Sequence, residues 1–148
     1  GVQRRFSHLF DHNKISFYDD YAHHPTEISS VLSGVEKVYE NKEIVCVFQP
    51  HRISRVKSLK KEFSKCFKKA DTVLLCPIYT ANEKLRLNFT YHSFAKLIIK
   101  NSNVRLIQVE DELQLQKFIK QNVFGKKIYI GMGAGSISNW MKNLKNIF

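Results

Sequence analysis

Carboxylates, imidazoles and guanidiniums gather directly after two apolar stretches of this chain. The first run is FYDDYAHHPTEI, residues 17–28, and the second is FQPHRISR, residues 48–55. In an open α/β sheet, ligands bind in the crevice outside the carboxyl ends of the strands. If the two apolar stretches form neighbouring strands, their polar residues face one crevice. The sequence therefore predicts a polar ligand site at this edge.

The second run contains the sharpest group, His51, Arg52 and Arg55. If a helix begins near Ile53, the two arginines lie three residues apart on one side of it. Their planar forks match a carboxylate, and a helix N-terminus attracts anions. Cations alone at that end would oppose the helix dipole, so a bound anion would compensate them. We expect an anion site here rather than a solvated basic pair.

The first run offers a carboxylate, Asp20, between a strand and a helix start. A carboxylate in this position can accept hydrogen bonds from ribose hydroxyls, although helix capping is the alternative. Side chains alternate along extended chain, so Asp19 is expected to face the other way, while Tyr21 and His23 share a face. Tyr21 supplies a wall and a hydroxyl, and His23 can donate or accept. His24 is expected to cap the following helix.

The histidines and a glycine-rich loop could suggest a metal site and a dinucleotide site, but their spacing argues against both. The histidines His23, His24 and His51 have no further ligand at a spacing typical of metal sites, so we predict no metal. The loop GMGAGS, residues 131–136, departs from G-x-G-x-x-G and is followed by no acid about 20 residues on, which excludes independent NAD binding. Close approach of its backbone to a substrate or phosphate remains open, with Gly133 and Ser136 as candidates.

Strands and helices alternate along the chain. Strands are expected at residues 5–10, 15–18, 44–48, 72–76, 104–109 and 127–130, and helices at 25–39, 56–69, 91–100, from 111 onward and at 136–146, with loops at 78–88 and 131–135. This order predicts an α/β domain with a Rossmann-like, mostly parallel sheet and helices on both faces. The first two of about six strands are too close for a helical crossover, so one antiparallel strand is expected at the edge.

Size and composition fit one domain, residues 1–148. Hydrophobic residues make up 43% of the chain, which is enough for a core, and no apolar run reaches the length of a membrane span. Three cysteines with no C-x-x-C spacing favour a reducing cytoplasm, with Cys46 and Cys76 as small core residues.

A net charge of +11 is compatible with nucleic-acid binding, so the distribution of the basic residues must be considered. The lysines at 57, 60, 61, 65, 68 and 69 recur at helical spacing, which is typical of a solvated basic face. We therefore expect no nucleic-acid partner, and we expect the charge to steer anionic nucleotides.

The motifs DDYAHHPTEI and FQPHRISR resemble the C-terminal domain of the Mur ligases, and among them the members that add alanine. The similarity extends to GVQRRF at residues 1–6 and to the glycine loop, so it covers nearly the whole chain. The cytoplasmic enzymes of that family have three domains, and this chain is long enough for one. The resemblance thus implies that the N-terminal UDP-binding and central ATPase domains are missing here.

The resemblance also implies an activity, the ATP-driven joining of L-alanine to UDP-N-acetylmuramate through an acyl phosphate in peptidoglycan synthesis. It assigns amino-acid binding to Tyr21, His23, His51, Arg52 and Arg55, and nucleotide binding to Asp20 and to Arg5, with Arg4 as the alternative to Arg5. ATP and Mg²⁺ would be held mainly by the central domain, and no catalytic residue lies in this domain alone. Two other readings stay open: a related ligase that recycles murein tripeptide, which should depart at HRxxR, and a stand-alone anion- or nucleotide-binding module.

Overall fold

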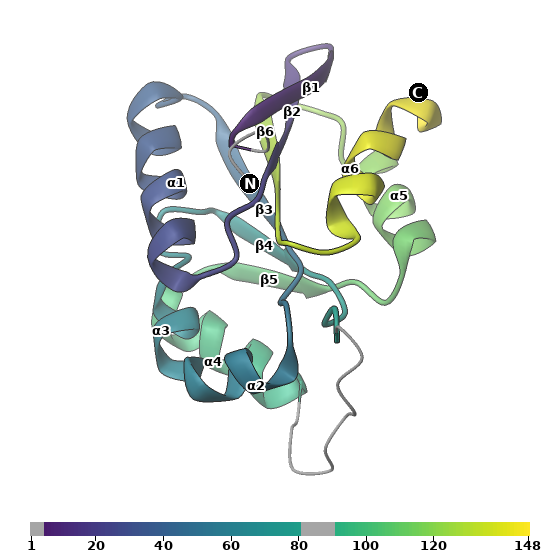
Figure 1. Ribbon diagram of the computed structural model, residues 1–148. Coiled ribbons are helices and arrows are strands. Elements are labelled where there is room, and N and C mark those ends of the chain that lie inside the picture. Colours follow the sequence, from purple (N-terminus) through teal and green to yellow (C-terminus); the bar gives the residue numbers. More distant parts are fainter. Residues whose placement is uncertain (1–4, 81–90) are drawn as a thin grey trace.

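The computed structural model describes residues 5–80 and 91–148 (Figure 1). Two of the expectations above fall outside these residues: the alternative nucleotide contact Arg4, and residues 81–88 of the expected loop. No helix in the described ranges has the length and apolar character that a bilayer crossing requires.

A six-stranded sheet forms the centre of the domain. Its strands are β1 (Ser7–His12), β2 (Ile15–Asp20), β3 (Glu43–Phe48), β4 (Thr72–Leu75), β5 (Arg105–Gln108) and β6 (Lys127–Met132). They lie in the order β1-β2-β6-β3-β4-β5, with β1 antiparallel to β2 and every other pair parallel. The expected sheet, mostly parallel with an antiparallel edge strand, is confirmed.

Helices cover both faces of this sheet (Figure 1). One face carries α1 (Pro25–Val38), α2 (Ile53–Ser58), α3 (Lys60–Lys65) and α4 (Tyr91–Ser102), and the other carries α5 (Glu112–Lys120), α6 (Ile137–Asn143) and the 3₁₀ helix Leu144–Ile147. Alternation along β3 divides the core, because Cys46 and Phe48 pack toward α1 and α3 while Val47 packs toward α5 and α6. The fold therefore has three layers.

The three cysteines lie in this core as free thiols. Burial raises the pKa of Cys46 and Cys66 and raises that of Cys76 to about 12, so none is an activated nucleophile. Cys46 and Cys76 are core residues, as the sequence predicted.

Several element bounds differ from the expectation. Strand β1 is shifted from the expected 5–10 to Ser7–His12, and β2 continues two residues further, to Asp20. The helix expected at 56–69 begins at Ile53 and is divided at Leu59 into α2 and α3, and the last helix becomes 3₁₀ at Leu144. Strand β6 continues to Met132, because both of its neighbours pair with it to that point: Asp20 and Phe48 each lie opposite Met132. The expected glycine loop thus starts inside the sheet.

The start of α1 is fixed by a reciprocal cap. The His24 ring accepts a hydrogen bond from the Thr26 N–H at 3.2 Å, and the Glu27 carboxylate accepts from the His24 N–H at 3.1 Å. This confirms His24 as the cap. Partial burial opposes ionisation of Glu27, but the bonds from the main chain of His24 and His23 outweigh it and hold the pKa of Glu27 below its ordinary value.

Replacing Glu27 by alanine is expected to lower the free energy of unfolding by about 1 kcal/mol at neutral pH, because α1 loses half of its cap. Since the pKa of Glu27 is lower in the folded state, its contribution is present above the unfolded pKa and is lost as the pH falls through the folded pKa. Urea unfolding of both proteins at neutral and acidic pH measures this difference. The exposed Glu36 of the same helix is the control, and an equal loss in Glu36→Ala would contradict a capping role.

Candidate functional site

The polar residues singled out in the sequence lie at the carboxyl edge of the sheet, but the two strands that carry them are not direct neighbours. Strand β6 lies between β2 and β3. Its carboxyl end is tied to both, because the Gln49 N–H donates to the Met132 carbonyl at 3.0 Å and the Gly133 N–H donates to the Asp20 carbonyl at 3.3 Å. The glycine loop therefore occupies the middle of the candidate site.

A row of rings crosses this edge from the end of β2 to the segment after β4. Ring centroids lie 5.0 Å apart for Tyr21 and His23, 6.0 Å for His23 and His51, and 5.4 Å for His51 and Tyr79. The His23 Nδ1 lies 3.0 Å from the Tyr21 carbonyl oxygen, which can only accept. We infer that Nδ1 donates and that Nε2 is left as an acceptor. The structure thus brings together three of the five residues expected to bind an amino acid.

The two arginines lie at the start of α2, because this helix begins at Ile53, as the hypothesis of an anion site required. Arg52 is the exposed N-cap residue and Arg55 is half-buried in the first turn, which carries no acid. The Arg52 backbone has φ 68° and ψ 131°, a region that non-glycine residues rarely occupy. Its N–H donates to the Tyr79 carbonyl at 2.8 Å. Backbone strain of this kind is maintained by the surrounding structure and concentrates at functional sites.

Arg52→Gly is expected to be more stable to unfolding than Arg52→Ala by about 1 kcal/mol, because glycine relieves the positive φ and alanine does not. Thermal and urea unfolding of the two variants measure the difference. Both variants lack the guanidinium, so neither is expected to bind the ligand through it. If Arg52→Gly is more stable than Arg52→Ala but binds ligand no better, the backbone strain affects stability and the side chain affects binding. Equal stability of the two variants would contradict the strain.

Asp20 is buried at the end of β2, with 4% of its surface exposed. Its two oxygens accept main-chain hydrogen bonds from Ala22 and Phe6, each at 2.7 Å. Burial raises the pKa of Asp20, although these two bonds favour its charged form. Asp19 faces the opposite side of the sheet and accepts a hydrogen bond from Ser138 at 2.6 Å, which confirms the alternation expected from the sequence.

A pocket of about 500 Å³ lies beside Asp20, and we call it the Asp20 pocket. Its lining includes Arg5, Phe6, Asp20, Tyr21 and Glu27. Both residues expected to bind a nucleotide, the exposed Arg5 and the buried Asp20, therefore face one cavity. Tyr21 belongs to this pocket and also to the row of rings, so the two candidate sites adjoin.

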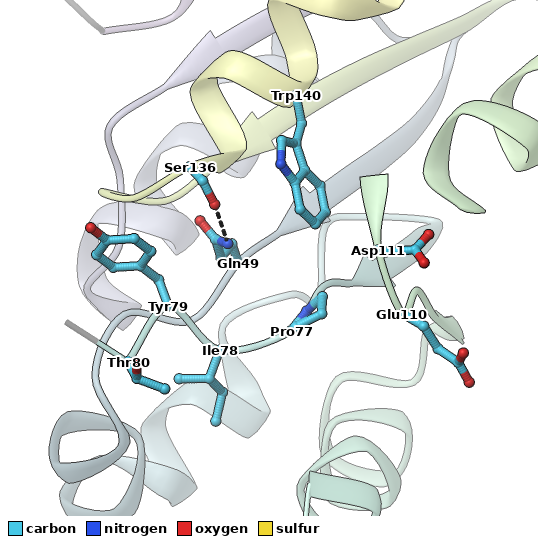
Figure 2. A pocket seen from close by; sticks show the side chains of 9 residues that line it. All are labelled: Gln49, Pro77, Ile78, Tyr79, Thr80, Glu110, Asp111, Ser136 and Trp140. Carbon is cyan, nitrogen blue, oxygen red and sulfur yellow. Dashed lines mark hydrogen bonds between the residues drawn. The ribbon is translucent and has the colours of Figure 1, made fainter. Parts of the chain in front are cut away.

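A second pocket, of about 370 Å³, lies at the end of the glycine loop, and we call it the Gln49 pocket (Figure 2). Its walls include Gln49, Tyr79, Ser136 and Trp140. Ser136 lines this cavity, and its expected contact with a substrate or phosphate stays a prediction. Gly133 is instead in contact with the protein itself, because a Cβ there would lie 2.9 Å from the Gln49 carbonyl oxygen. Its expected contact with a ligand stays a prediction.

Sequence reasoning missed Gln49 and Tyr79. A signal for Gln49 was present, since an amide directly after the buried, apolar residues 44–48 of β3 is costly to bury without partners. Tyr79 follows β4 and gave no comparable signal. Within the described residues, no three histidine, cysteine or acidic side chains come close enough to hold a metal ion.

The three-layered fold, with two pockets and a row of aromatic rings at the carboxyl edge of its parallel strands, defines an α/β domain of the open-sheet type. Residues 4–135 match the family described as "Mur ligase, glutamate ligase domain", and the chain belongs to this family.

Among sequence relatives, the chain is 65% identical over 147 residues to a UDP-N-acetylmuramate–L-alanine ligase from Pelagibacter ubique. The match covers 99% of this chain and 32% of that protein. The chain therefore spans about a third of the length of this relative.

Two solved structures have the same fold. A UDP-N-acetylmuramate–alanine ligase from Thermotoga maritima matches with a TM-score of 0.69 and 29% identity, covering 97% of this chain and 29% of that one. A domain assigned to a UDP-N-acetylmuramate:L-alanyl-γ-D-glutamyl-meso-diaminopimelate ligase from Haemophilus ducreyi matches with a TM-score of 0.70 and 21% identity, covering 97% of this chain and 100% of that one. The second likeness concerns the fold alone, and in that structure the chain consists of this one domain.

Proposed function

We propose that this chain is the C-terminal domain of an ATP-dependent ligase that joins L-alanine to UDP-N-acetylmuramate in peptidoglycan synthesis. The observation that carries the proposal is the 65% identity, over 99% of the chain, to a ligase of that name. The site supports it, since two arginines at the start of α2 lie at the edge that carries the His23–His51 pair. The free cysteines and the nucleotide substrates fit a cytoplasmic enzyme.

The proposed reaction has two steps. The muramyl carboxylate attacks the γ-phosphate of ATP to give an acyl phosphate and ADP. The alanine amine then attacks the acyl carbon, an amide bond forms, phosphate leaves and the amine gives up a proton. An acyl phosphate hydrolyses in water, so the site must exclude water while the amine is held at attack distance.

This domain would present the amine. Arg52 and Arg55 would hold the alanine carboxylate through charge-assisted hydrogen bonds, which keeps the amine free to react. Tyr21, His23 and His51 would form the polar wall of the amino-acid site, and Ser136 would face the substrate from the glycine loop. ATP and any Mg²⁺ that accompanies it would be held mainly by the central domain of the enzyme.

Asp20 and Arg5 would bind the nucleotide from the Asp20 pocket. The carboxylate has lone pairs beyond the two that the main chain uses, and these can accept from ribose hydroxyls. The Arg5 side chain is exposed and can reach the phosphates of ATP held by an adjoining domain.

A chimera tests the proposal: this chain replaces the matching 147 residues of the Pelagibacter ubique ligase. Phosphate release with ATP and UDP-N-acetylmuramate is expected to require L-alanine. Release that requires a murein tripeptide instead would assign the chain to the recycling ligases. If none of the amines tested supports phosphate release, the chain would instead be an anion- or nucleotide-binding module.

The 148-residue chain alone is expected to release no phosphate from ATP, because it contains no G-x-x-x-x-G-K-[ST] loop to hold the phosphates. Phosphate release measured beside the chimera, at equal protein concentration, checks this. Alanine-dependent release by the chain alone, at a rate comparable to the chimera, would contradict the assignment of ATP chemistry to the missing domains.

A further inference from the structure

We propose that Gln49 is a positioning residue that holds Arg52 in place for the amino-acid carboxylate, acting through the glycine loop and Tyr79. The proposal rests on the function proposed above, because it concerns how the arginine site is kept in shape.

The Gln49 side chain reaches from the end of β3 to the start of α6, and Figure 2 shows its bond to Ser136. Its Nε2 donates to the Ser136 hydroxyl at 3.0 Å, and its Oε1 accepts from the Ile137 N–H at 3.0 Å. Its own N–H donates to Met132. With 3% of its surface exposed, Gln49 makes these bonds out of water, where an unmade bond is costly. One amide thus joins the end of β3 to the segment that follows β6.

The glycine loop is shaped to fit this amide and Tyr79. A Cβ at Gly135 would lie 2.9 Å from the Gln49 Oε1 and 2.8 Å from the Tyr79 Cδ2. A Cβ at Gly133, whose φ is 153°, would lie 2.9 Å from both the Gln49 carbonyl oxygen and the Ile137 Cγ2. Glycine is therefore required here for contacts within the protein, whatever ligand binds.

Tyr79 connects the glycine loop to Arg52. Its ring packs on the backbone of Gly135 and stacks on His51, with centroids 5.4 Å apart and planes 15° apart. Its carbonyl accepts the Arg52 N–H at 2.8 Å, and its N–H donates to the Pro50 carbonyl at 2.8 Å. Gln49, Gly135 and Tyr79 thus form one connected series of contacts that ends at Arg52, which we call the Gln49 clasp.

The clasp has a reason to exist at this position. Arg52 has a positive φ, so its backbone does not maintain this conformation unaided. A guanidinium must keep its direction to bind a carboxylate bidentately, and a shift of about 1 Å is enough to lose much of a positioned contact. Without the clasp, we expect Arg52 to relax and the carboxylate site to loosen while the sheet itself stays folded.

Kinetics of the chimera test this. Gln49→Met fills the same volume without either side-chain hydrogen bond and is expected to raise the KM for L-alanine about tenfold while the KM for ATP stays unchanged. Gln49→Glu keeps the acceptor for Ile137 and can accept from the Ser136 hydroxyl, so it is expected to recover most of that loss. Equal defects in the two variants, or equal changes in both KM values, would overturn the proposal.

A matched control separates positioning from stability. Ser102 is equally buried, accepts from the Phe67 N–H at 3.1 Å and donates to the Ser64 carbonyl at 2.6 Å, all on the α3 and α4 side of the domain. Ser102→Ala is expected to lower the melting temperature as Gln49→Met does and to leave the KM for L-alanine unchanged. A rise in that KM in Ser102→Ala would mean that loss of stability alone weakens alanine binding.

A variant in the glycine loop disturbs the clasp without changing Gln49 itself. Gly135→Ala places a methyl group against Tyr79 and the Gln49 Oε1, so it must displace one of them. It is expected to raise the KM for L-alanine in the same way as Gln49→Met. A normal KM for L-alanine in Gly135→Ala would contradict transmission through Tyr79.

Amide hydrogen exchange of the 148-residue chain tests the clasp without any activity, since a solved structure of this fold contains the one domain alone. In Gln49→Met, exchange at Ile137 and at Arg52 is expected to be about tenfold faster, with Val73 in the buried β4 unchanged. Faster exchange at Ile137 without any change at Arg52 would overturn the proposal. A chimera that fails to use L-alanine would overturn the proposed function, and this measurement would still decide whether the clasp exists.

Discussion

Arg52→Ala and Arg55→Ala are each expected to raise the KM for L-alanine about 100-fold or more in the chimera, because a bidentate, charge-assisted contact to the substrate carboxylate is worth about 3 kcal/mol. The two side chains begin α2 at the same edge as His23 and His51. Steady-state phosphate release at varied L-alanine, with ATP and UDP-N-acetylmuramate saturating, measures the effect. The KM for ATP is expected to stay within the error of the parent enzyme.

Arg105 provides the matched control for these variants. It is exposed at the start of β5, so it lies at the amino edge of the parallel sheet, opposite the candidate site. Arg105→Ala removes the same charge and is expected to leave the KM for L-alanine unchanged. Equal effects in all three variants would mean that the net positive charge attracts substrate non-specifically, which high salt would then abolish. A loss of kcat alone in the Arg52 and Arg55 variants would contradict a carboxylate contact.

The class of fold could be predicted because its signals are local. Each buried strand is a short apolar run and each helix repeats its apolar residues with its own period, so neither needs knowledge of distant parts of the chain. Strand order depends on distant parts of the chain, and nothing in residues 17–28 or 48–55 indicates that β6 lies between β2 and β3. The break at Leu59 was also missed, because Phe63 and Phe67 continue the helical spacing across it and both are fully buried.

The same distinction separates the site residues. Asp20, Arg52 and Arg55 could be selected from the sequence because charged groups directly after buried strands need a compensating partner. Gln49 bonds to Ser136 and Ile137, which lie 87 and 88 positions further along the chain. Tyr79 acts through its backbone and its packing on Gly135. Nothing in a single sequence joins such distant residues, so the candidate ligand contacts were predictable and their supporting contacts were not.

Asp20→Asn is expected to lower the free energy of unfolding by about 2 kcal/mol at acidic pH, because an amide can accept only one of the two main-chain hydrogen bonds that the carboxyl group now takes. Burial raises the pKa of Asp20 above its ordinary value. The stability that this group contributes is therefore present below the unfolded pKa and declines as the pH rises through the folded pKa. The difference between parent and variant is expected to shrink from acidic to neutral pH, which urea unfolding at each pH measures.

In the chimera, Asp20→Asn is expected to raise the KM for ATP about tenfold and to leave the KM for L-alanine unchanged, the reverse of the arginine variants, because a carboxylate that accepts from ribose hydroxyls is lost. Asp19→Asn is the control, since Asp19 is equally buried but faces Ser138 on the other side of the sheet. Both variants weaken the fold, and only the loss of Asp20 changes the Asp20 pocket. If Asp19→Asn raised the KM for ATP as much, the defect would come from the fold and Asp20 would not bind the nucleotide.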